Sequence, residues 1–299
     1  MSKRNPNKIK EGKTIYTVLV YVAVAFLCFL AVYPMYYVLI MSLSSPENAA
    51  QMNVYVIPKG FCVDAYKVLV QDPEMWRAYL NTIIYVIPTT ILMLATCVLV
   101  AYPLTYKRLM GRKFVNMFLL IPMYFGGGMI PWYLLYANVL NLKGTAFVIW
   151  FPGITSSFLV ILMRTFIQSS VPDAIAESAK IDGAGPFTIF IRIVLPVLKP
   201  GLATVGLFLA LGYWNDWYRS SLFSTNANTY ELQFYLYNML SSTTALKDLA
   251  VGATAQIESI PGQSMKIAMA VIVTGPVLLF YPFVQRYFVS GITVGAVKG

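Results

Sequence analysis

Long apolar runs with almost no charge limit what this 299-residue chain can fold into. A helix needs about 20 apolar residues to cross the hydrocarbon core of a bilayer. Only 11% of the residues are charged, against about 25% in an ordinary soluble domain, so a water-exposed surface could not be covered. The sequence therefore predicts an all-α, polytopic membrane protein and excludes a soluble enzyme, a disordered chain and a disulfide-rich secreted module. Six transmembrane helices are expected near residues 16–42, 80–104, 114–137, 145–166, 201–222 and 265–286.

The distribution of basic residues predicts the orientation of these spans. The net charge is +10, and roughly two thirds of the 22 Lys and Arg residues fall in the two tails and in the even-numbered loops. Both termini are therefore expected in the cytoplasm, and the positive charge indicates membrane topology rather than nucleic acid. Residues 1–15 form the predicted cytoplasmic N-tail, and 16–299 a single transmembrane domain. The first run is too long for a signal-peptide core, and no clear cleavage site follows it, so we expect it to be retained.

The chain lacks the residues that most membrane enzymes and metal sites use. It contains no histidine, and its three cysteines, Cys28, Cys62 and Cys97, are too far apart to suggest a disulfide framework or a metal cluster. Gly12-Lys13-Thr14 imitates the end of a phosphate-binding loop, but Asn7 stands where that motif has its first glycine. We expect no cofactor on this chain, no appended energy-supplying domain and no catalytic residue.

Two features within the spans are open to structural or functional interpretation. Gly126, Gly127 and Gly128, followed by Pro131, interrupt the third span, where they predict either a kinked packing helix, which we favour, or a broken helix lining a path. Pro88 and Pro103 predict bends in the second span.

The cytoplasmic loop 167–200 carries the most informative pattern. Ser170 and Asp173 have capping-box-like spacing, Gly183 suits a left-handed helix stop, and Pro186 and Pro196 suit the start and end of a second helix. The loop is therefore predicted to form two short helices at an angle. The first helix has a stripe of small and aliphatic side chains that could enter a groove on a partner: Ala174, Ser178 and Ile181, with Ile175 and Ala179 beside them. Periodicity alone favours the alternative, a surface helix that simply joins two spans.

The spacing within this loop resembles the EAA loop of ABC importer permeases. Glu177-Ser178-Ala179 is followed after three residues by Gly183, after nine more by Ile193, and after one more by Leu195-Pro196. Every fixed position matches except Ser178, where the family usually has alanine. The resemblance implies a type I ABC importer permease fold and a coupling loop that docks into an ATPase subunit. The coupling residues that it implies are Glu177, Ser178, Ala179, Asp182, Gly183, Leu195 and Pro196.

The C-terminal tail, 287–299, extends the resemblance. Its ending, Gly-Ala-Val-Lys-Gly, looks like that of one of the two permease subunits of the maltose class of carbohydrate importers. In that class the tail reaches the ATPase dimer interface, which implies ATPase contacts for Gly295, Lys298 and Gly299. A frayed terminus is the structural alternative.

The end of the fifth span, Trp214-Asn215-Asp216-Trp217-Tyr218-Arg219, also resembles the maltose class. Aromatic rings can stack on sugars, and Asn and Asp can bind hydroxyls, so Trp214, Asn215, Asp216 and Trp217 are candidates for a substrate path. An interfacial aromatic belt is the alternative, with Asp216 and Arg219 as a structural pair on one helical turn.

Together the resemblances imply a permease subunit of an ATP-driven, binding-protein-dependent sugar or oligosaccharide importer in the bacterial cytoplasmic membrane. The implied partners are a second, homologous permease, an ABC ATPase dimer that binds ATP and Mg, an extracytoplasmic solute-binding protein and the lipid bilayer. An independent ion-coupled secondary carrier is the alternative, although the scarcity of acidic residues within the spans argues against it.

Overall fold

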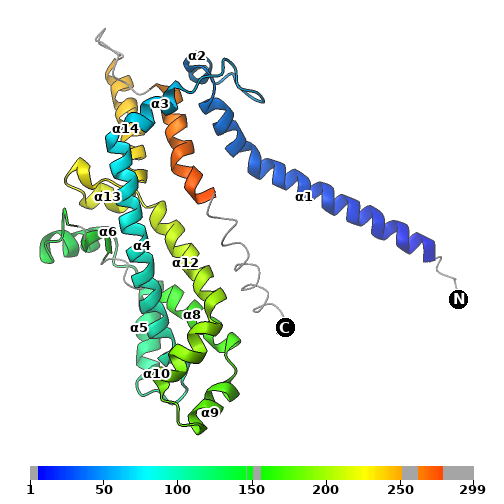
Figure 1. Ribbon diagram of the computed structural model, residues 1–299, viewed down its shortest axis with the longest axis vertical. Helices are drawn as coiled ribbons and strands as arrows, with labels where there is room; N and C mark the ends of the chain where they lie inside the picture. Colours follow the sequence, from blue (N-terminus) through cyan, green and yellow to red (C-terminus); the bar gives the residue numbers. More distant parts are fainter. Residues whose placement is uncertain (1–5, 146, 151–155, 251–261, 279–299) are drawn as a thin grey trace. The chain divides into compact units, whose positions relative to one another are not determined.

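The computed structural model describes residues 6–145, 147–150, 156–250 and 262–278, and these residues form helices and connecting turns without a strand (Figure 1). The chain divides into two compact units. One comprises the residues up to Gln71 together with Ser242–Ile272, and the other comprises Asp72–Ser241 together with the residues from Val273 onward. This all-helical architecture confirms the all-α part of the predicted fold class.

The first unit is dominated by the long helix α1 (Pro6–Ser42), followed by the short helices α2 (Pro46–Ala50) and α3 (Asp64–Gln71). Within α1, Tyr16–Ser42 is long and apolar enough to cross a membrane, as predicted for 16–42. Most of its side chains are exposed, and apolar residues surround the helix on all sides, as in a helix that spans a membrane. Only its last turns pack within the unit, where Ile40 and Met41 are buried against Val54.

The core of the second unit is built from α4 (Pro73–Ala101), α8 (Ser157–Ser170) and α12 (Lys199–Trp214), which pack against one another. Cys97, Val160 and Val205 are fully buried between them. Gly201 allows the closest approach, because a Cβ atom there would lie 3.1 Å from the Phe166 ring. These helices therefore pack too tightly for a larger side chain at residue 201.

The helical bounds differ from the predicted spans most strongly in the third. It consists of α5 (Arg112–Tyr124) and, after a bend of 114°, of α6 (Met129–Leu134). Helix α6 continues directly into the π-helical turn η2 (Leu135–Val139). Gly128 adopts φ +83°, and within the described residues a Cβ on Gly126 or Gly127 would meet nothing within 4 Å. The favoured expectation of a kinked packing helix is therefore wrong, because the glycines break the helix.

The second, fourth and sixth spans agree more closely with expectation. Helix α4 begins seven residues earlier than predicted, continues through Pro88, and gives way to the 3-10 turn η1 (Pro103–Thr105). The fourth span contains α7 (Phe147–Trp150) and α8, with 151–155 outside the described residues. The sixth begins as a helix over Gln263–Leu278, and its predicted remainder lies outside the described residues.

The fifth span ends earlier than predicted, and further helices follow it. Helix α12 stops at Trp214, and α13 (Tyr218–Phe223), η5 (Ala227–Thr229) and α14 (Leu232–Ala250) follow. Helix α14 therefore lies between the predicted fifth and sixth spans. Among the described residues, two helices are each long and apolar enough to cross a membrane. Three further pairs of helices, each bent at a break, would be long and apolar enough if each pair forms one span.

Candidate functional site

The EAA-like spacing of the sequence motif falls on a helical hairpin that follows α8. Its first helix is α9 (Asp173–Ile181), and its second consists of α10 (Pro186–Ile189), the π-helical turn η4 (Phe190–Val194) and α11 (Leu195–Val197). A bend of 75° then leads into α12. The two predicted short helices are thus confirmed. The predicted capping box is wrong, because Ser170 is the last residue of α8, and Pro172, which precedes α9, makes no side-chain cap.

Gly183 ends α9 as predicted, by adopting φ +81°. The backbone amide of Ala184 donates to the Ala179 carbonyl at 2.9 Å, and that of Gly183 donates to the Lys180 carbonyl at 3.0 Å. This pair of hydrogen bonds is a Schellman motif, which requires a left-handed residue at the position of Gly183. A Cβ at Gly183 would meet nothing within 4 Å of the described residues, so the requirement is one of backbone conformation rather than of space.

The two faces of α9 have different surroundings. Ala176 and Ala179 are partly buried against the core of the second unit, as is Ala184 beyond the helix. Glu177 and Ser178 are exposed, and Ile181 is 87% exposed. Glu177 has no hydrogen bond or ion pair within the part of the chain that the structure describes. The hairpin therefore presents an acidic and an apolar side chain outward from a firmly packed base.

Of the remaining motif residues, Asp182 and Pro196 are exposed and Leu195 packs against the core.

Aromatic residues at the end of α4 hold the hairpin in place. The Tyr102 hydroxyl donates to the Pro186 carbonyl at 3.1 Å, and the Tyr102 ring lies 4.8 Å from that of Phe190. The Tyr102 hydroxyl also contacts that of Tyr106, whose ring lies 4.9 Å from the Lys180 ammonium. Both helices of the hairpin are thereby joined to the predicted second span. Sequence reasoning missed these tyrosines, because no local pattern places them beside a loop about 80 residues away.

The second group of predicted residues lies where α12 ends, and most of its polar atoms already have partners. The Trp214 indole N–H donates to the Val273 carbonyl at 3.1 Å. The Asn215 side chain donates to the Leu211 carbonyl at 2.9 Å and accepts from Gln233 Nε2 at 3.1 Å. These contacts fix the chain as it leaves α12.

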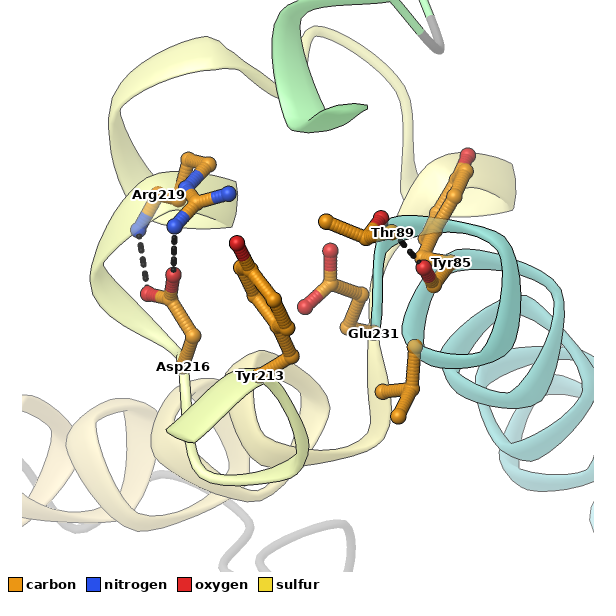
Figure 2. A pocket seen from close by; sticks show the side chains of 7 residues that line it. Tyr85, Thr89, Tyr213, Asp216, Arg219 and Glu231 are labelled. Atoms are coloured by element: carbon orange, nitrogen blue, oxygen red, sulfur yellow. Dashed lines mark hydrogen bonds and ion pairs between the residues drawn. The ribbon is translucent and has the colours of Figure 1, made fainter. Parts of the chain in front are cut away.

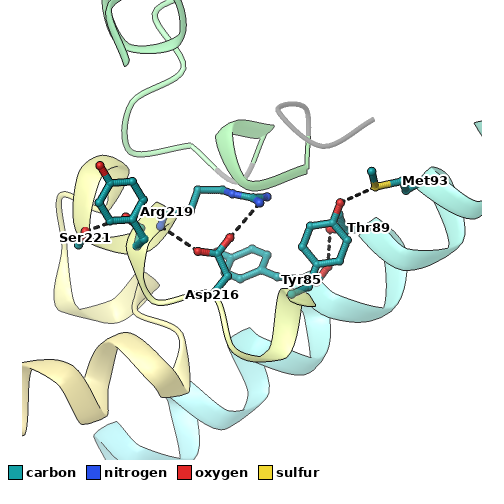
Figure 3. Close-up of polar contacts among 8 residues, drawn as sticks. Tyr85, Thr89, Met93, Asp216, Arg219 and Ser221 are labelled. Atoms are coloured by element: carbon teal, nitrogen blue, oxygen red, sulfur yellow. Dashed lines mark hydrogen bonds and ion pairs between the residues drawn. The ribbon is translucent and has the colours of Figure 1, made fainter. Parts of the chain in front are cut away.

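Asp216 and Arg219 form the structural pair that the sequence allowed (Figure 3). Asp216 Oδ2 lies 2.8 Å from Arg219 Nη2, and Oδ1 accepts from the Arg219 backbone amide at 3.0 Å. The Arg219 guanidinium also lies 5.3 Å from the centre of the Tyr213 ring. Asp216 therefore organises the first turn of α13.

A small polar pocket adjoins this pair (Figure 2). Side chains from α4, α12, α13 and the residues just before α13 and α14 line this pocket, which has room for about one water molecule. Figure 2 shows the Glu231 carboxyl pointing between Tyr213 and Thr89. Glu231 is only 4% exposed, and its Oε1 atom has no hydrogen-bond partner among the described residues. Burial, together with the negative charge of Asp216, raises the pKa of Glu231 to about 8 despite the opposing effect of Arg219. Sequence reasoning missed Glu231, which no motif singles out.

Trp217 is the one predicted path residue with a broad, accessible ring. It is 38% exposed and stacks on Tyr237 with 4.4 Å between ring centres and 15° between ring planes. Tyr237 in turn lies parallel to the buried Phe234. We call Trp217 and Tyr237 the aromatic platform. Helix α14 supplies Tyr237, which lies outside the motifs of the sequence analysis.

The predicted tail contacts, Gly295, Lys298 and Gly299, lie outside the described residues. The cysteines Cys28, Cys62 and Cys97 are free thiols.

Comparison with known proteins places this fold. No family model matches the chain. It is 35% identical over 272 residues to Protein LplC of Bacillus subtilis (strain 168), which covers 90% of each chain. It is 30% identical over 286 residues to the polygalacturonan/rhamnogalacturonan transport system permease protein YtcP of the same organism, over 95% of this chain and 99% of the relative. A chain from the crystal structure of a bacterial ABC transporter involved in the import of the acidic polysaccharide alginate superposes with a TM-score of 0.77 and 27% identity, covering 93% of this chain and 98% of that one.

The all-helical fold and these relatives define the class of the chain as a transport permease. The chain belongs to the carbohydrate permeases of ABC importers, which confirms the family implied by the EAA-like spacing. It is therefore a transport subunit rather than an enzyme, and ATP hydrolysis falls to a separate ATPase subunit. These relationships favour the importer over an independent secondary carrier.

Proposed function

We propose that this chain forms half of the translocation path of a sugar or oligosaccharide importer in the bacterial cytoplasmic membrane. In this proposal it spans the membrane six times as one permease domain, with both termini in the cytoplasm, and pairs with a second, homologous permease. An ATPase dimer that holds ATP and Mg acts from the cytoplasm, and an extracytoplasmic solute-binding protein delivers the sugar. The permease relatives and the apolar helices support this assembly.

The α9 hairpin is the proposed mechanical joint, and the division between its two faces carries this proposal. Ala176 and Ala179 anchor α9 to the α4–α8–α12 core, while Glu177 and Ile181 face outward. A force applied to the outer face would therefore pass directly to packed helices, which is what rigid-body alternating access requires. We propose that the tail residues Gly295, Lys298 and Gly299 add a second contact with the ATPase.

A photo-crosslinking amino acid tests which face of α9 meets the ATPase. Placed at Ile181 in the assembled transporter, it should attach to the ATPase, because this side chain projects from the helix. The matched position is Ala176, which packs against the permease core and should give crosslinks only within the permease. Gel analysis with antibodies against each subunit would show the products. Crosslinking to the ATPase from Ala176 but not from Ile181 would contradict the proposed docking face.

For the sugar path, we propose Trp217 of the aromatic platform as the contact residue. The Tyr237 ring holds it parallel, so one ring face is supported and the other can accept a sugar face. Trp214, Asn215 and Asp216 have the structural partners described above, and their proposed part is to position Trp217 rather than to bind hydroxyls.

Replacing Trp217 with alanine should raise the sugar concentration needed for half-maximal uptake by roughly threefold to tenfold, the equivalent of about 0.5–1.5 kcal/mol of lost ring contact. Trp217→Phe should keep most of the affinity, because a ring remains. The control is Trp76→Ala, which removes another exposed tryptophan outside the platform. Uptake of radiolabelled oligosaccharide into proteoliposomes that contain the whole transporter is the measurement. Equal effects of Trp217→Ala and Trp76→Ala would show that Trp217 has no particular part in sugar binding.

A further inference from the structure

A short apolar turn in the first unit is not covered by the residues that the structure describes. After α2 the chain passes through Val54, which is buried, and then exposes three consecutive apolar side chains: Tyr55 by 60%, Val56 by 64% and Ile57 by 72%. We call Tyr55–Ile57 the apolar turn. Single exposed apolar residues are ordinary, but three in succession, in a segment outside the membrane spans predicted from the sequence, require a reason.

The apolar turn folds back along α1 instead of extending beyond it. The Tyr33 hydroxyl donates to the Tyr55 carbonyl at 3.2 Å, and the Tyr36 hydroxyl donates to the Val56 carbonyl at 2.5 Å. Six residues separate Tyr36 from the end of α1 at Ser42, which corresponds to about 9 Å along the helix axis. The turn therefore lies well below the end of the helix, beside residues of the apolar run.

The depth of Tyr33 and Tyr36 in the bilayer, and with it the depth of the apolar turn, follows from the sequence of α1. The last basic residue before the apolar run is Lys13, and the membrane-crossing stretch begins at Tyr16. About 20 residues cross the hydrocarbon core, so a helix that enters at Tyr16 leaves the core near Met35. Tyr33 and Tyr36 bracket this position. The apolar turn accordingly lies at the outer boundary between hydrocarbon and headgroups.

The residues after the apolar turn reach the height of the lipid headgroups. The Lys59 carbonyl accepts from the Ser45 amide at 3.0 Å, and the Lys59 amide donates to Ser44 Oγ at 3.2 Å. Lys59 is thus level with the residues just beyond α1, and its exposed side chain lies where lipid phosphates would be. Apolar side chains at the hydrocarbon boundary and a cation above them form the depth profile of an interfacial anchor.

We propose that the apolar turn is an anchor in the outer leaflet, with phospholipid as its partner and Ile57, the most exposed of its three side chains, as its main contact. The tyrosine hydroxyls support a lipid partner specifically, because a carbonyl placed near hydrocarbon needs an internal donor where water is scarce. The anchor would fix the height of the segment that connects α1 with α4 on the extracytoplasmic side. This inference rests on the membrane placement of α1 in the proposed function.

Spin-label accessibility in nanodiscs of phosphatidylethanolamine and phosphatidylglycerol tests the anchor in the assembled transporter. The native cysteines would first be replaced with serine, and the variant retained only if it still transports. Labels would then be placed at Ile57 and, separately, at Val56, with exposed Val24 in α1 as the lipid reference and exposed Glu47 in α2 as the aqueous reference. Molecular oxygen, which partitions into lipid, and a nickel chelate, which remains in water, are the colliding reagents.

The ratio of oxygen to nickel accessibility at Ile57 and Val56 is expected to exceed that at Glu47 severalfold and to approach that at Val24. A ratio equal to that at Glu47 would overturn the anchor by placing the turn in water. Low accessibility to both reagents would overturn it by showing that another protein surface covers the turn. An aqueous ratio at Val24 itself would instead overturn the membrane placement of α1, so failure of the proposed function can be told apart from failure of the anchor alone.

Discussion

Replacing Glu177 with lysine and Gly183 with proline in one variant is expected to abolish ATP-driven uptake while leaving membrane insertion intact. Glu177 contributes its charge to the exposed face of α9, so lysine reverses the charge offered to the ATPase. Gly183 needs φ +81°, whereas proline is held near −65° and lacks the N–H that donates to the Lys180 carbonyl. The variant would therefore lose both the surface and the helix stop that presents it.

Uptake into proteoliposomes and ATP hydrolysis should be measured on the same preparation of this double variant. We expect uptake to fall below about one tenth of the wild-type rate, which corresponds to more than about 1.4 kcal/mol of lost coupling. Gly111→Pro is the control, because Gly111 also has a positive φ, of +75°, but lies before α5 and outside the hairpin. Normal uptake by the double variant would remove the hairpin from the mechanism.

The stability of the protein should depend on pH through Glu231. Its pKa is about 8 in the folded chain against 4.5 for an ordinary glutamate, so the folded state holds a proton that the unfolded state has released between these values. Stability is therefore expected to fall as pH rises from about 4.5 to about 8, and to show no further loss from this group above that range. The slope contributed by one carboxyl is at most about 1.4 kcal/mol per pH unit.

Glu231→Gln should remove this pH dependence, because glutamine has the same shape and remains neutral. Near pH 8 the variant is expected to melt at a higher temperature than the wild type, and near pH 5 the two should melt at similar temperatures. Glu47→Gln, at an exposed position on α2, serves as the control and should leave the wild-type profile unchanged. Thermal unfolding of the purified chain in detergent across pH 5–8 provides the comparison. Parallel profiles for wild type and Glu231→Gln would show that Glu231 is already ionised at neutral pH.

The sequence supported the parts of the fold that depend on local patterns. The apolar run of α1, the helix stop at Gly183 and the start of α10 at Pro186 each follow from residues adjacent in the chain, and all three are present in the structure. The pairing of Asp216 with Arg219 was foreseeable for the same reason, because three residues place both side chains on one helical turn.

Features that depend on distant segments could not be predicted in this way. Hydropathy treats 114–137 as one apolar run, yet three glycines allow a bend of 114° that no sum of apolar residues reveals. Helix α14 has a mixed composition, and its first residues are held by α4, where Thr82 Oγ1 accepts from the Leu232 amide at 2.8 Å. The contacts of Tyr102 with the hairpin and the burial of Glu231 likewise arise only after the helices pack.

The most direct test of the account is uptake by purified components in proteoliposomes. The chain would be reconstituted with its partner permease, the ATPase subunits and the solute-binding protein, and labelled oligosaccharide would be followed with and without ATP. The account predicts uptake that requires ATP and the binding protein and does not respond to an imposed ion gradient. Uptake by this chain alone, driven by a proton or sodium gradient without ATPase subunits, would contradict it.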